Sequence, residues 1–93
     1  MSCHQRSILI VESEVSLFVQ RLQALLEERG AETLVARSQQ AAAERCRQFV
    51  FSAALVNAEH RAIVPQLAIP ALLYVKTEAP REIVDGLERL LAA

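Results

Sequence analysis

Short apolar runs alternate with longer amphipathic stretches along the whole chain. Residues 7–12 (SILIVE) and 51–56 (FSAALV) consist mainly of consecutive apolar residues. Runs of this kind, without polar alternation, are typical of strands that are covered on both faces. A weaker run at 31–36 and a further run at 69–75 bring the number of predicted strands to four. The pattern therefore predicts a sheet that is buried between layers of helices.

Helices are predicted in the stretches between these runs. After the first run, apolar residues recur at spacings of three and four, as on one face of a helix. They are Val15, Phe18, Val19, Leu22, Leu25 and Leu26. Ser13 is expected to cap the start of this helix, and Gly30 is expected to follow its last turn.

Three further helical segments follow. Ser38 is expected to cap a helix over 39–49. In 58–68, Pro65 limits any helix to a turn or two before a loop. A closing helix with one apolar stripe follows Pro80.

Regular alternation of strands and helices favours a parallel sheet with right-handed crossovers. The predicted fold class is α/β, a doubly wound three-layer α/β/α sandwich with a mostly parallel four-stranded sheet. Ninety-three residues are expected to form a single domain, residues 1–93.

Composition excludes several classes of function. The formal net charge is −1 and the basic residues form no cluster, which gives no electrostatic case for nucleic acid or an anionic membrane. No apolar stretch is long enough to span a bilayer, and the first residues do not resemble a secretory signal, so a cytoplasmic location is expected. Cys3, His4 and His60 lack a metal-ligand spacing, and Cys46 is expected to fill a small space in the core. No metal or cofactor is therefore expected.

Four segments carry a resemblance to a known family. They are ILIVESE (8–14), FSAALVN (51–57), IPALL (69–73) and YVKTEAPREIVDGLERLL (74–91). Together they resemble the receiver domain of bacterial two-component response regulators, a CheY-like, flavodoxin-like fold. The chain is shorter than members of that family, and the missing length falls between residues 58 and 76. The resemblance thus implies a truncated receiver fold without one helix and one strand, with the strand order 2-1-3-4.

The resemblance also implies which residues stand at the family's phosphorylation site. There, an Asp at the end of the third strand accepts a phosphoryl group, with a Mg²⁺ held by nearby acids and a Lys on the phosphoryl oxygens. Asn57 falls on the acceptor position. Glu12, Ser13 and Glu14 fall on the acidic pocket, where Ser13 replaces the usual metal-binding Asp. Lys76 matches the family's lysine.

These replacements predict that the chain is not phosphorylated in the usual way and is not an enzyme, with no catalytic residue. Asn57 is expected to cap the end of its strand, and Glu12 and Glu14 to lie in a solvated turn. Lys76 is expected to lie over the strand ends, or else to bond to Asn57.

The favoured function is a pseudo-receiver in two-component signal transduction that binds proteins, such as a histidine kinase or another response regulator. One alternative is a phosphorelay receiver that uses an unusual carboxylate, namely Glu12, Glu14 or Glu59. A second is a small-ligand module, although Gly30 and Gly86 are the only glycines and form no phosphate-binding motif.

A truncated sheet would leave the strand at 69–75 on an edge, and an apolar edge tends to pair with another chain. A homodimer is therefore expected, either by pairing of this edge or by packing of the last helix. The expected dimer surface comprises Leu73, Tyr74, Val84, Leu87 and Leu91. The alternative is that the stripe of the last helix only closes the core of its own domain.

Overall fold

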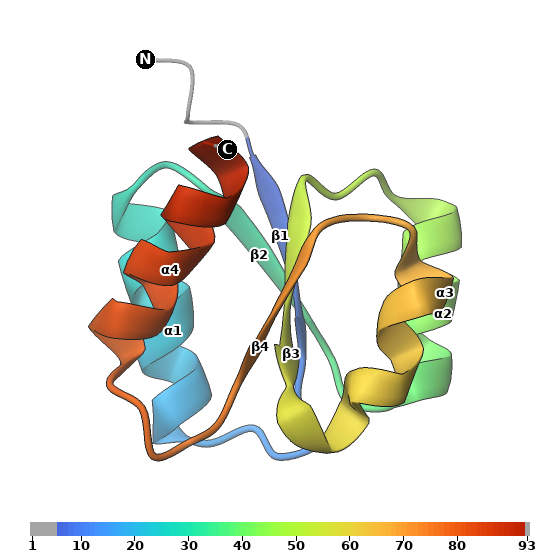
Figure 1. Cartoon of the computed structure of the whole chain (residues 1–93), viewed down its shortest axis with the longest axis horizontal. Helices are drawn as coiled ribbons and strands as arrows, with labels where there is room; N and C mark the ends of the chain where they lie inside the picture. Colours follow the sequence, from blue (N-terminus) through green and yellow to red (C-terminus); the bar gives the residue numbers. More distant parts are fainter. Residues whose placement is uncertain (1–5, 93) are drawn as a thin grey trace.

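The computed structural model describes residues 6–92, and they form a four-stranded parallel sheet between two layers of helices (Figure 1). The strands are β1 (Ser7–Val11), β2 (Glu32–Ala36), β3 (Ala53–Asn57) and β4 (Ala71–Tyr74). Their order is β2-β1-β3-β4, and each neighbouring pair is parallel. The predicted fold class and strand order are confirmed.

The helices divide between the two faces of the sheet. On one face lie α1 (Leu17–Glu28) and α4 (Pro80–Ala92), and on the other lie α2 (Gln39–Gln48), the 3₁₀ helix η1 (Ala58–Ile63) and α3 (Val64–Leu67). Right-handed crossovers between parallel strands produce this distribution.

The central strands explain why their sequences are apolar at consecutive positions. Ile8 and Ile10 of β1 pack toward α1 and α4, whereas Leu9 and Val11 pack toward α2 and α3. All four side chains are almost completely buried. Successive side chains of a strand point to opposite faces, so a strand between two helical layers is apolar throughout.

Helix α1 begins later than the sequence predicts. Ser16, rather than Ser13, stands at its N-cap, so the prediction for Ser13 is wrong. The physical reason is that the preceding loop folds back over Glu12, whose Oε2 accepts from the Glu14 N–H. At the other end, Gly30 has a φ of 86°, as predicted for the residue after the last turn.

Helix α2 has the predicted cap, since the Ser38 Oγ accepts a hydrogen bond from the Ala41 N–H at 3.0 Å. The segment after β3 folds into η1 and the single turn of α3, which has Pro65 in its first turn. Residues 75–79 then connect β4 directly to α4.

Strand β4 is shorter than the run at 69–75 and is an edge strand. Three of the five residues expected at a dimer surface are buried in the core: Tyr74, Val84 and Leu87. They cannot form a contact surface in this fold, because their side chains face α1 or the sheet. Leu73 is exposed and Leu91 is half-buried.

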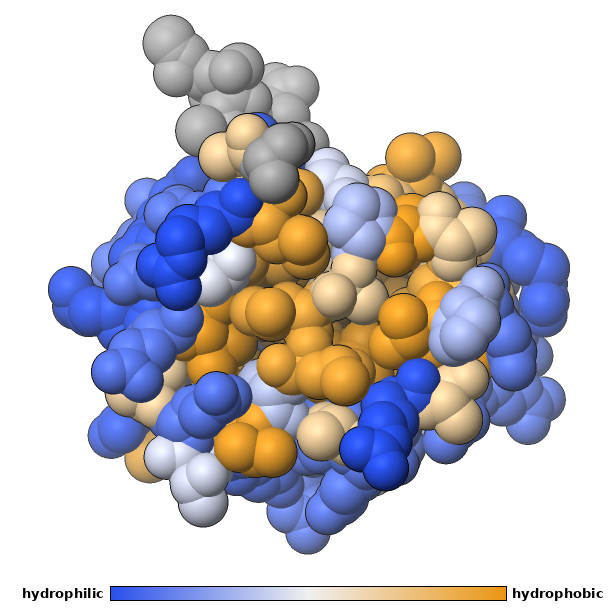
Figure 2. Space-filling model, viewed as in Figure 1, coloured by the Kyte–Doolittle hydropathy of each residue, from blue (hydrophilic) through white to orange (hydrophobic). Residues whose placement is uncertain are grey.

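Figure 2 shows that apolar side chains gather on the face that β4 presents, between α4 and α3. Polar and charged side chains surround this area. Within residues 6–92, no helix is both long and apolar enough to cross a bilayer.

Candidate functional site

Three strands end side by side at one edge of the sheet. Glu12 directly follows β1, Asn57 is the last residue of β3, and Tyr74 is the last residue of β4. The register places Asn57 opposite Tyr74, and Val11 opposite the residue before Asn57. The carboxyl ends of parallel strands are where α/β folds assemble their sites.

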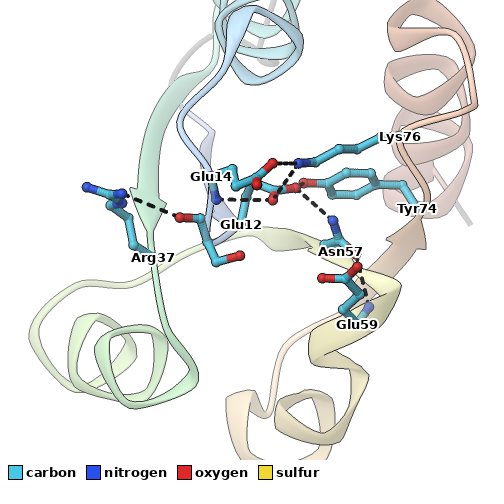
Figure 3. Close-up of polar contacts among 8 residues, drawn as sticks. Glu12, Glu14, Arg37, Asn57, Glu59, Tyr74 and Lys76 are labelled. Carbon is cyan, nitrogen blue, oxygen red and sulfur yellow. Dashed lines mark hydrogen bonds and ion pairs between the residues drawn. The ribbon is translucent and has the colours of Figure 1, made fainter.

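Glu12 is the centre of this cluster, with only 1% of its surface exposed. Its Oε1 accepts hydrogen bonds from Asn57 Nδ2 at 2.8 Å and from the Tyr74 hydroxyl at 2.7 Å (Figure 3). Its Oε2 accepts from the Glu14 N–H at 3.3 Å and lies 3.3 Å from Lys76 Nζ. Both oxygens of the carboxylate are therefore engaged, by four donors in all.

These contacts keep Glu12 charged. Burial by itself raises the pKa of the Glu12 carboxyl, because it disfavours the ionised form. The hydrogen bonds from the four donors outweigh burial and hold this pKa below its ordinary value of 4.5. Burial and then the bond to Glu12 raise the pKa of the Tyr74 phenol, so its hydroxyl remains a donor.

Asn57 uses both ends of its amide. Its Nδ2 donates to Glu12, and its Oδ1 accepts from the Glu59 N–H at 2.9 Å. An amide can serve both partners, whereas an ionised carboxylate has no donor for Glu12. The side chain thus caps η1, in agreement with the expected capping role, and bonds to the end of β1 as well.

Lys76 lies across the outer side of the cluster (Figure 3). Its Nζ is 2.6 Å from Glu14 Oε1, and this hydrogen bond is the main cause of the raised pKa of Lys76. Among the contacts of residues 6–92, its ammonium meets the two glutamates and not the Asn57 side chain, so the expectation of an Asn57 bond is not met. A cavity of about 220 Å³ lies beside it, lined in part by Ser13, Asn57 and Glu59.

The structure brings together most of the residues singled out from the sequence, with two differences. The two acids do not share one solvated turn, because Glu12 is buried while Glu14 is exposed. The role of Tyr74 was missed in the sequence, where the residue was assigned to a dimer surface. Its place at the end of a strand neighbouring β3 was the available signal, since parallel strands end together.

In the part of the chain from residue 6 to 92, no three His, Cys, Asp or Glu side chains lie close enough together to hold a metal ion. Cys46 is a free, half-buried thiol, whose pKa burial raises. Cys3 and His4 lie outside the described residues.

Comparisons with known proteins support the fold. No protein-family model matches this sequence, and no curated protein matches it. Two receiver-type structures are similar. A response regulator receiver domain protein (CheY-like) from Methanospirillum hungatei JF-1 has a TM-score of 0.70 and 15% identity, covering 95% of this chain and 94% of that chain. The Vibrio cholerae chemotaxis protein CheY4 has a TM-score of 0.65 and 14% identity, covering 92% of this chain and 98% of that chain.

A third similar structure is described as a yeast Spc42 trimeric coiled coil fused to another solved structure. It has a TM-score of 0.79 and 16% identity, covering 99% of this chain and 80% of that chain. At these identities the likenesses concern the fold alone. This chain has a CheY-like receiver fold.

Proposed function

We propose that this chain is a receiver-like signalling module that is not phosphorylated and that binds other proteins in one fixed conformation. The observation that carries the proposal is the hydrogen bond between Asn57 and the buried Glu12 carboxylate. In the resemblance to receiver domains, these two positions hold the acceptor carboxylate and one of the metal-binding acids.

Asn57 lacks the chemistry of a phosphoryl acceptor. A receiver forms an acyl phosphate on a carboxylate, and an amide oxygen is a far poorer nucleophile. The Oδ1 of Asn57 is also engaged by the Glu59 N–H. An incoming phosphoryl group would meet an oxygen that already caps η1.

Glu12 is equally unsuited to hold Mg²⁺. This ion requires oxygen ligands in near-octahedral geometry and retains several waters. Both Glu12 oxygens accept hydrogen bonds from the protein, and the Lys76 ammonium lies 3.3 Å from one of them. A cation would have to displace these donors, and Ser13 supplies no charge in compensation.

Around Glu12, protein groups take the role that Mg²⁺ has in a receiver domain. Lys76 neutralises part of the negative charge, and Tyr74 and Asn57 bond to the rest. Because these groups come from the ends of β1, β3 and β4 or just beyond them, they tie the strand ends together. We infer that the module is held in a single state and acts in the cytoplasm on a histidine kinase or another response regulator.

Acetyl phosphate tests the first half of the proposal. The protein is incubated with acetyl phosphate and Mg²⁺, and its intact mass is measured beside a phosphorylatable receiver domain as the positive control. The wild-type mass is expected to stay unchanged. A gain of one phosphoryl group would contradict the proposal and favour the alternative, phosphorylation at a carboxylate such as Glu14 or Glu59.

Co-purification tests the second half. The wild-type protein and the Asn57→Asp variant are compared as baits for a histidine kinase or response regulator of the same cell. A partner retained equally by both baits is expected, and retention by the wild type is expected to be the same in the presence and absence of acetyl phosphate. Retention that depends on acetyl phosphate would show that a phosphorylation switch operates.

A further inference from the structure

The outer edge of β4 carries a short row of backbone groups that face away from the sheet. The Ala54 N–H donates to the Pro70 carbonyl at 2.9 Å, which fixes the pattern of the parallel ladder. In such a ladder, each residue directs both its N–H and its C=O to the same side of the strand, and consecutive residues alternate between the two sides. Leu72 and Tyr74 therefore face β3, whereas Ala71, Leu73 and Val75 face outward.

Glu78 closes this edge at one end. The Val75 N–H donates to Glu78 Oε1 at 3.1 Å, and the Glu78 N–H donates to the Val75 carbonyl at 3.1 Å. Glu78 thus takes the place of a residue on a neighbouring strand. At the other end the chain bends at Ile69, before the strand begins. Among residues 6–92, no hydrogen bond engages the outward groups of Ala71 and Leu73.

The side chains of β4 suit contact with an apolar partner. The strand reads ALLY and carries no charge. Leu73 is 43% exposed, and no helix of residues 6–92 follows β4 to cover it on the α3 side. Figure 2 shows the apolar area that results between α4 and α3. Exposed strand edges of this kind are templates for pairing.

We propose that a second copy of this chain pairs with β4 in antiparallel orientation, with the two-fold axis beside Leu72. In this register Ala71 lies opposite Leu73 of the partner subunit, and Leu73 opposite the partner subunit's Ala71. Each such pair exchanges two hydrogen bonds, so two pairs give four. The result is one continuous sheet across the dimer.

The partner at this edge is a second copy of the chain, because the free backbone groups of Ala71 and Leu73 are symmetric about Leu72. The edge is therefore complementary to itself, and its hydrogen bonds are satisfied without displacing Glu78. The uncharged strand brings no like charges together. On the α3 side, the bulky Leu73 covers the small Ala71 of the other chain. On the α4 side, the two Leu72 residues form a closely spaced pair that makes no mutual backbone hydrogen bonds. This inference does not depend on the proposed function.

A proline substitution tests the pairing. In Leu73→Pro the lost N–H faces outward, so the ladder with β3 is retained while the dimer loses two donors, one in each subunit. Leu73→Ala is the matched control, since it shortens the side chain and keeps the donor. Sedimentation velocity is measured up to about 100 μM, because weak dimers form in the micromolar range. Far-UV circular dichroism verifies the fold.

The wild type is expected to convert from monomer to dimer over this range, and Leu73→Ala to do so with weaker affinity. Leu73→Pro is expected to remain monomeric. A monomeric wild type, or dimerisation of Leu73→Pro equal to that of Leu73→Ala, would overturn the proposal. Pairing through α4 alone would lead to equal dimerisation of Leu73→Pro and Leu73→Ala.

Cross-linking tests the register and does not depend on the proline variant. In a Cys3→Ser, Cys46→Ser background, Leu72→Cys places two thiols across the axis at a separation that a disulfide can span. Leu73→Cys places each thiol opposite Ala71. Under mild oxidation, dimers are expected for Leu72→Cys only. Cross-linking at 73 alone, at both positions equally or at neither overturns the register.

Discussion

At the scale of single residues, Glu12 is the unusual feature of this molecule. A buried ionised carboxylate is strongly unfavourable unless its oxygens are bonded and its charge is compensated. Here Asn57, Tyr74 and the Glu14 N–H supply hydrogen bonds, and Lys76 supplies the opposite charge. Removal of any donor should therefore weaken the fold measurably.

Tyr74→Phe removes one donor and keeps the ring, which stacks on Phe18 at a centroid distance of 5.9 Å. The free energy of unfolding at neutral pH should fall by about 1.5–3 kcal/mol, as for hydrogen bonds to charged groups. Urea denaturation measures this loss. In a Glu12→Gln background the same substitution should have a smaller effect, and an equal effect would contradict the role of the bond.

The pH dependence of stability follows from the lowered pKa of Glu12. A carboxyl whose pKa is lower in the folded state contributes stability above its unfolded pKa, which is near 4.5. That contribution is lost as the pH falls through the folded pKa. Tyr74→Phe removes a donor and raises the folded pKa, so acid unfolding should begin at a higher pH than in the wild type. Thermal melts at a series of acidic pH values check this order.

Asn57→Asp places a second carboxylate in the position of an amide that lies 2.8 Å from Glu12 Oε1. Like charges at this distance should destabilise the protein by about 1–3 kcal/mol at neutral pH. Added Mg²⁺ should restore part of the loss by binding between the two carboxylates. Asn57→Ala is the control, whose stability should not respond to Mg²⁺. Thermal melts with and without Mg²⁺ distinguish them, and an equal response of both variants to Mg²⁺ would contradict the role of the second carboxylate.

The sequence predicted the site only in part at this scale. Glu12, Asn57 and Lys76 were located through their matches to receiver motifs, and the structure brings them together. The burial of Glu12 was not predicted, because no local pattern shows that the following loop will fold back over it. The role of Tyr74 was missed because the predicted strand runs to residue 75, whereas β4 ends at Tyr74.

At the scale of elements, the two glycines have different roles. Gly30 ends α1 with a positive φ, and its N–H and that of Ala31 donate to carbonyls of the last turn. Gly86 lies inside α4, where an added Cβ would come within 3.3 Å of Leu72 Cδ2. Leu72 is only half-buried at the sheet edge, so its side chain has room to move.

Gly30→Ala should therefore destabilise the protein by about 1 kcal/mol, the approximate penalty for a residue with a Cβ in the left-handed region. Gly86→Ala should be neutral or stabilise α4 by about 0.5 kcal/mol, because alanine is the better helix former. Urea denaturation of both variants checks the contrast. A larger loss for Gly86→Ala would show that the Leu72 side chain does not move aside.

The boundaries of elements were harder to predict than their existence. The run at 69–75 reads as one strand, but Ile69 bends and Val75 bonds to Glu78. Neither the bend nor this hydrogen bond can be predicted from the amino-acid composition of the strand. Ser13 and Ser16 are equally good cap residues by type. Ser16 occupies the N-cap position because the loop before it folds over Glu12, although its hydroxyl makes no hydrogen bond to the first turn.

At the scale of the whole molecule, the alternation of apolar runs and helices was sufficient to predict a parallel sheet between helical layers, and the resemblance to receiver domains supplied the strand order. Each central strand packs on both faces, as expected for a parallel sheet with helices on both sides. The edge at β4 was also predicted. The hydrogen bonds of Glu78 determine which backbone N–H and C=O groups of that edge are free, and the sequence does not show these bonds.

If β4 pairs with a second copy, the thermal midpoint should depend on protein concentration. Binding that occurs only in the folded state raises apparent stability by mass action. The midpoint of the wild type should therefore rise as concentration increases from about 1 to 100 μM. The midpoint of Leu73→Pro should stay constant over the same range. Scanning calorimetry at several concentrations checks both, and a constant midpoint for the wild type would contradict dimerisation.

In the proposed function, protein donors saturate Glu12 at the position where a receiver domain would hold a metal ion. The most direct measurement is an NMR pH titration of the Glu12 side-chain carboxyl carbon, with and without millimolar Mg²⁺. We expect a pKa of Glu12 below 4.5 and no response of the resonance to Mg²⁺ at neutral pH. A pKa above that value, or a saturable shift on addition of Mg²⁺, would contradict it.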